Sequence, residues 1–94
     1  STAASEDAPA QVSESKLSWQ EQKEEQARLR KLENEVKKIE AEIEKLENEN
    51  EELTELLQTD EVSTNSVKLQ EISSKIEKNT NRLEELMERW ESIQ

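Results

Sequence analysis

The stretch LRKLENEVKKIEAEIEKLENENEELTELL, residues 29–57, decides the fold of this chain. Its apolar side chains recur at alternating steps of three and four residues, which is the a/d pattern of a coiled-coil seam. A helix with such a narrow apolar stripe needs a partner helix with a matching stripe. The positions of this first seam are Leu29, Leu32, Val36, Ile39, Ile43, Leu46, Asn50, Leu53 and Leu57.

A second stretch, LQEISSKIEKNTNRLEELMERWESI at residues 69–93, repeats the pattern. A short polar segment, residues 59–66, interrupts the repeat between the two. Two seams joined by a short polar segment predict an all-α fold, in which two long helices form an antiparallel coiled-coil hairpin. The positions of the second seam are Leu69, Ile72, Ile76, Asn79, Leu83, Leu86, Trp90 and Ile93.

The sequence also predicts the boundaries of these elements. Residues 1–15 are small, polar and aperiodic, so we expect a flexible linker or tail. The hairpin takes residues 16–94, with helix 1 over about 18–58, a loop over about 59–65 and helix 2 over about 66–94. Ser18 and Glu21 have the spacing of a capping box at the start of helix 1. Asn65 or Ser66 is the predicted N-cap of helix 2.

Asn50 and Asn79 indicate the register of the two seams. In one register they share a layer and hydrogen-bond to each other, whereas a slide of one heptad strands both amides in the apolar seam. Stranding a buried amide costs about 1–3 kcal/mol, more than exposed ion pairs usually contribute, so we expect the shared layer. Trp19 to about Leu32 then project beyond helix 2. The expected flanking ion pairs are Glu42–Arg89 and Glu49–Arg82, and the slid register would align Glu35–Arg89, Glu42–Arg82 and Glu49–Lys75.

Composition excludes several classes of function. Of the 94 residues, 30% are hydrophobic and 39% are charged, which does not suffice for an ordinary globular core. The net charge of −11 argues against broad non-specific binding of nucleic acid and against an anionic membrane surface. The chain has no Cys and no His, and it has neither a membrane-length apolar run nor a signal-peptide pattern. We therefore expect a cytoplasmic location, no membrane partner, and no catalytic, cofactor-binding or metal-binding residue in this domain.

Helix 1 nevertheless carries a local group of basic residues, which are candidates for contacts with phosphates of a structured RNA or DNA. The alternative is that these cations alternate with anions for solubility. The candidate nucleic-acid contacts are Lys23, Arg28, Arg30, Lys31, Lys37 and Lys38.

The asparagines and tryptophans of the chain have other interpretations. Asn50 and Asn79 are interpreted as register-setting residues. Trp90 is expected to pack in the seam. Trp19 is expected to pack under a folded-back N-terminal segment, or to stack on a partner.

Two strings at the ends of the hairpin resemble a known family. The string KLSWQEQKE, residues 16–24, resembles the entry motif of the C-terminal domain of Uup-type ABC-F ATPases, and LEELMERWE, residues 83–91, resembles its closing motif. The resemblance implies a coiled-coil domain attached to two upstream ABC ATPase domains, which would bind ATP and Mg²⁺. It also implies a soluble parent that acts on ribosomes or in translation, and a C-terminal domain that binds nucleic acid.

The leading hypothesis is a non-catalytic C-terminal arm that helps an ABC-F ATP-binding protein engage ribosomal RNA, tRNA or DNA through the basic part of helix 1. A second hypothesis is an acidic protein–protein interaction coiled coil without nucleic-acid binding. A third is a structural coiled coil that dimerises. We expect a monomer, because each seam finds its partner within the chain at high effective concentration.

Overall fold

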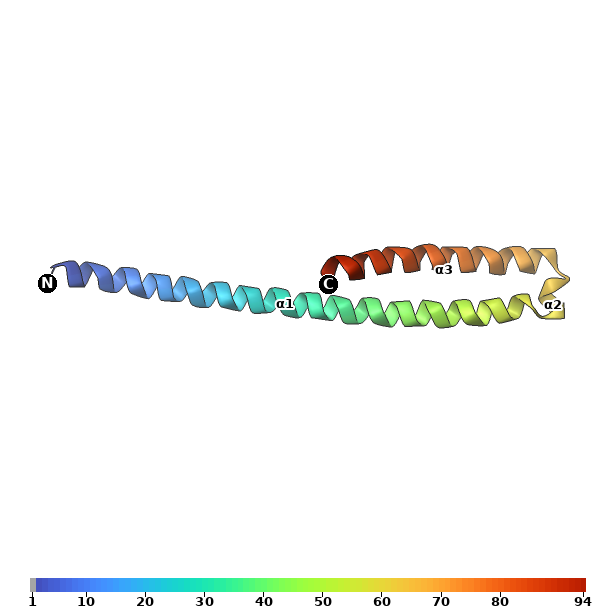
Figure 1. Ribbon diagram of the computed structural model, residues 1–94, viewed down its shortest axis with the longest axis horizontal. Coiled ribbons are helices and arrows are strands. Elements are labelled where there is room, and N and C mark those ends of the chain that lie inside the picture. Colours follow the sequence, from blue (N-terminus) through green and yellow to red (C-terminus); the bar gives the residue numbers. More distant parts are fainter. Residues whose placement is uncertain (1) are drawn as a thin grey trace. The chain divides into compact units, whose positions relative to one another are not determined.

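A computed structural model describes the backbone of residues 2–94 and the side chains of residues 15–94. The described part forms the helices α1 (Thr2–Leu57), α2 (Asp60–Ser63) and α3 (Ser66–Ile93) (Figure 1). The chain divides into two compact units, Ser1–Asn34 and Glu35–Gln94. The first unit consists of the N-terminal part of α1. The second contains the rest of α1 together with α2 and α3.

α1 begins at Thr2, upstream of the start expected near Ser18, so Ser18 lies inside the helix and does not cap it. The residues before Ser18 include several alanines and no glycine, and alanine is the strongest helix former. Only Pro9 opposes the helix there, because proline has no N–H to donate. The mobility expected of residues 1–15 is a separate property and stays a prediction.

The second unit is an antiparallel helical hairpin. Its part of α1 and α3 lie side by side and run in opposite directions (Figure 1). Seam residues Ile39 and Leu86 are only 6% and 4% exposed, and most of the other apolar seam positions are half-buried. Trp90 is 36% exposed, because a two-helix seam is too narrow to cover an indole ring. The fold class predicted from the heptad pattern is confirmed.

The connection between the long helices contains a short helix that the sequence analysis treated as loop. Within α2, the side chain of Val62 is buried at 5% exposure. Asn65 is the N-cap of α3, since its Oδ1 accepts from the backbone N–H groups of Val67 and Lys68, both at 3.1 Å. This cap satisfies two of the N–H groups that the first turn of a helix leaves without a partner.

The predicted asparagine layer forms in the second unit. Asn79 Nδ2 donates to Asn50 Oδ1 at 3.0 Å and to Glu49 Oε1 at 3.1 Å. Asn50 Nδ2 in turn lies 3.4 Å from Thr80 Oγ1, which it approaches as a donor. The described residues have no buried side-chain nitrogen or oxygen without a hydrogen-bond partner. The two amides are therefore accommodated in the seam by each other and by polar neighbours at its edge.

The flanking ion pairs correct the sequence analysis. Arg82 pairs with Glu42 at 3.1 Å, Arg89 pairs with Glu35 at 2.5 Å, and Lys75 pairs with Glu49 at 3.5 Å. These are the pairs expected for the slid register, and the predicted pairs Glu42–Arg89 and Glu49–Arg82 are wrong. The Glu49 carboxylate accepts from Asn79 and pairs with Lys75, whereas Arg82 pairs with Glu42 and Arg89 with Glu35.

Candidate nucleic-acid interface

The first unit carries four of the six candidate residues, and all four are exposed. Leu29 and Leu32 occupy seam positions, and on this frame Lys23 and Arg30 fall at position b of the heptad and Lys31 at position c. Positions b and c lie away from an a/d seam, so these side chains extend into solvent.

Arg28 differs from the other candidates because it is held by an ion pair. Its Nε and Nη2 donate to the two oxygens of Glu25 at 2.9 and 2.6 Å. This hydrogen bonding lowers the pKa of Glu25 and raises the pKa of Arg28. Glu25 thus occupies two of the five N–H donors of Arg28 and offsets its charge, which makes Arg28 less attractive to a phosphate. The ion pair between Glu25 and Arg28 could have been predicted from the sequence, because the two residues are three apart on a helix.

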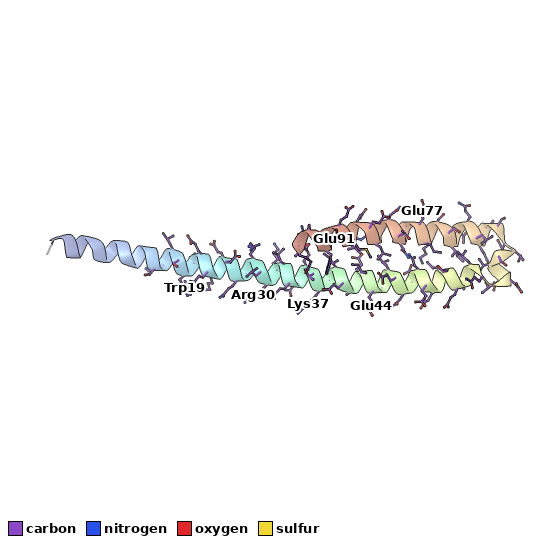
Figure 2. All side chains as sticks on the ribbon, in the orientation of Figure 1. Trp19, Arg30, Lys37, Glu44, Glu77 and Glu91 are labelled. Carbon is purple, nitrogen blue, oxygen red and sulfur yellow. The ribbon has the colours of Figure 1, made fainter. Side chains whose placement is uncertain are left out.

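Lys23 is held by an aromatic ring. Its Nζ lies 4.4 Å from the centroid of the Trp19 ring, one helical turn away, which is a cation–π distance. Trp19 itself is 60% exposed and extends from α1 (Figure 2). The expectation that a folded-back N-terminal segment covers Trp19 is wrong, because α1 is continuous from Thr2.

The second unit holds the other two candidates, Lys37 and Lys38. Both are exposed, whereas Val36 is half-buried and Ile39 is buried. They occupy positions b and c, as Arg30 and Lys31 do in the first unit. The structure gives no ion pair between Arg30, Lys31, Lys37 or Lys38 and any described residue.

The turn of the hairpin is acidic, whereas the candidate residues are basic. Residues 47–61 include seven acidic residues and no Lys or Arg. From outside this segment, Lys68 donates to Glu61 at 2.8 Å, and this hydrogen bond lowers the pKa of Glu61. The turn therefore repels phosphates at neutral pH.

Asn50 and Asn79 lie in the seam and have no room for a ligand between them, since their amides are in direct contact. Their influence extends to Glu49, whose pKa is lowered chiefly by the hydrogen bond from Asn79 and further by the charge of Lys75. The layer is an internal polar contact across the seam, and its role in setting the register stays a prediction.

A shallow concavity on the surface of the second unit is lined by residues of α1 alone. Because no second helix contributes to it, the concavity cannot surround a ligand. The residues that line it are Ala41, Glu44, Lys45, Asn48, Glu49 and Glu52.

Within residues 15–94, no group of acidic side chains has the arrangement of a metal site. Among the helices that the structure describes, none is both long and apolar enough to cross a membrane.

One feature of the interface was missed by the sequence analysis. Lys16 lies seven residues before Lys23, and Lys23 lies seven residues before Arg30, so the basic residues of position b begin earlier than the candidate set. The heptad frame identifies this row once it is extended upstream of Leu29. Charge alone did not single out Lys16, because its neighbours are uncharged.

Comparison with known proteins gives one match. A family model described as ABC transporter C-terminal domain matches residues 16–94, the range that the sequence analysis assigned to the hairpin. No curated protein and no solved structure matches the chain.

Proposed function

The chain belongs to the ABC transporter C-terminal domain family, and from this premise we propose that it is the non-catalytic arm of an ABC-F ATP-binding protein of the Uup type. The arm helps its parent engage ribosomal RNA, tRNA or DNA. ATP and Mg²⁺ belong to ABC domains upstream in the parent, which works in the cytoplasm in translation or another ribosome-associated process. The mechanism is positional, since a second contact raises the effective concentration of the ATPase core at its target.

The observation that carries this proposal is a group of exposed cations on α1. Arg30 and Lys31 in the first unit, and Lys37 and Lys38 in the second, are exposed and take part in none of the ion pairs described above. Exposed surface cations are the groups that bind phosphates and release counterions from nucleic acid.

The distribution of charge supports the same choice. Between Lys16 and Lys31 the chain has five basic and three acidic residues, a local net charge of +2, although the whole chain carries −11. Residues 47–61 carry seven acidic residues and no basic ones. A phosphate backbone is therefore attracted to the segment from Lys16 to Lys31 and repelled by the turn.

The test is binding of a fluorescent structured RNA and a duplex DNA at low salt, with Lys31→Glu compared to Lys78→Glu. Both lysines are exposed and both lie at heptad position c, so the two variants change the net charge equally. We expect Lys31→Glu to weaken binding and to reduce the salt slope by more than roughly 0.7–0.9, the share of one phosphate contact. Lys78→Glu should have the smaller effect.

Equal weakening by the two variants would mean that only net charge matters, and it would contradict a local contact on α1. If neither RNA nor DNA binds, the acidic surface remains, and the protein–protein interaction hypothesis takes first place. Pull-down of the chain with a basic ribosomal protein would then be the decisive assay.

A further inference from the structure

One face of the first unit combines cations with an exposed aromatic ring. Lys16, Lys23 and Arg30 follow one another at seven-residue intervals, close to two helical turns. Trp19 and Gln26 lie between them on the same face, because each is three or four residues from a cation. All five side chains are exposed, and we call them the Trp19 face.

Two acidic side chains close to Lys23 in the sequence lie on the opposite side of the helix. Glu21 and Glu25 are each two residues from Lys23, which turns them to the opposite side. Glu25 is moreover occupied by Arg28. No carboxylate lies three or four residues from Lys16 or Lys23, whereas Glu33 lies three residues after Arg30. The positive part of the Trp19 face is therefore centred on Trp19, between Lys16 and Lys23.

One face of the Trp19 indole ring is available to stack on a planar group. Lys23 Nζ lies 4.4 Å from the centroid of the ring and covers one of its faces. The residue is still 60% exposed, so the other face of the indole meets solvent. An exposed indole is costly to leave in water, and aromatic rings with one free face are the platforms on which nucleic-acid bases stack.

We propose that the Trp19 face binds unpaired nucleotides, with Trp19 stacking on a base while Lys16, Lys23 and Arg30 contact the flanking phosphates. This inference rests on the proposed function and specifies its ligand. Bases in a duplex are already stacked on each other, so an indole on a helix surface reaches a base only where the strand is unpaired. An RNA loop and a single strand of DNA share this chemistry.

The experiment uses the full chain with Trp90→Phe as the background, so that Trp19 is the sole fluorophore. The probes are an unstructured RNA and an unstructured DNA of about 12 nucleotides, within the roughly 4–16 nucleotides that single-strand sites occupy. A base-paired hairpin of equal length and inorganic polyphosphate serve as comparisons. We expect both single strands to quench Trp19 fluorescence, and the hairpin and polyphosphate to quench it little. Stronger binding of the RNA than of the DNA would identify RNA as the source of the ligand.

Trp19→Ala, followed by anisotropy of labelled strands, should weaken single-strand binding about tenfold or more and leave polyphosphate binding unchanged. Trp19→Phe should restore most of the affinity. Leu17→Ala is the matched control, because Leu17 is an equally exposed apolar residue, 62%, outside the Trp19 face. Single-strand binding that survives Trp19→Ala without loss would overturn this inference and leave the proposed function standing. Absence of binding to every nucleic acid would overturn both.

Discussion

Asn79 Nδ2 donates to Asn50 Oδ1 at 3.0 Å across the seam, and the two residues differ in their environment. Asn79 is buried at 8% exposure, whereas Asn50 is half-buried. The loss of one partner therefore has unequal consequences, because an amide that keeps access to water can replace a lost hydrogen bond and a buried amide cannot.

Asn50→Leu should destabilise the hairpin by about 1 kcal/mol or more, since it removes an acceptor from the buried Asn79 amide. Asn79→Leu should cost less, because the amide that remains is the more hydrated one. The double variant should be more stable than Asn50→Leu and the two changes should be non-additive in thermal and urea unfolding. Asn48→Leu, at an exposed position of the same helix, is the control. Additive effects would show that the two residues do not act as one layer.

The flanking ion pairs give a second prediction, which distinguishes the observed pairing from the pairing expected from the sequence. A double-mutant cycle of Glu42→Gln and Arg82→Gln should show coupling that falls as salt is raised, because these side chains form a bidentate pair at 3.1 and 3.2 Å. The cycle of Glu42→Gln with Arg89→Gln should show none. Coupling in the second cycle and not in the first would contradict the observed pairing.

The acidity of Glu49 gives a pH prediction. Its pKa is below the ordinary value of 4.5, chiefly because Asn79 hydrogen-bonds to the carboxylate. A carboxyl group with a lowered folded-state pKa contributes stability above its unfolded pKa, and this contribution is lost as the pH falls through the folded pKa. The destabilisation by Glu49→Gln should therefore be present at neutral pH and disappear in acid. Carboxyl NMR should find Glu49 titrating below the ordinary glutamate value of 4.5, and a midpoint at or above that value would contradict the contact.

The state of association is the fourth prediction. The seam of the second unit is filled within one chain, and a net charge of −11 makes copies repel each other. Sedimentation equilibrium should give the mass of a monomer across a wide range of concentration. A dimer would support pairing in trans and with it the structural coiled-coil hypothesis.

The parts of the fold that follow from period and burial were predictable from the sequence. The a/d spacing placed Ile39 and Leu86 in the seam, and the cost of a stranded amide paired Asn50 with Asn79. The ion pairs were not predictable in the same way, because long charged side chains reach several partners, and Glu49 combines a hydrogen bond from Asn79 with an ion pair to Lys75. The onset of α1 also escaped prediction, since alanines and polar residues without periodicity fit a helix as well as a linker.

The candidate site was predictable only as a set of charges. The sequence identified the exposed lysines and arginines, but the engagement of Arg28 by Glu25 and the position of Lys23 over Trp19 depend on side-chain conformation. These contacts leave Arg30, Lys31, Lys37 and Lys38 as the cations most available to phosphate.

The central claim is that nucleic acid binds to the basic residues of α1 and not to the turn, and backbone NMR tests it most directly. A titration of the full chain with structured RNA and with duplex DNA at low salt should shift the amides of residues 16–38. Binding should be lost when Arg30, Lys31 and Lys38 are all changed to Glu. Shifts confined to residues 47–61, or binding that survives the triple change, would contradict the account and favour a protein partner.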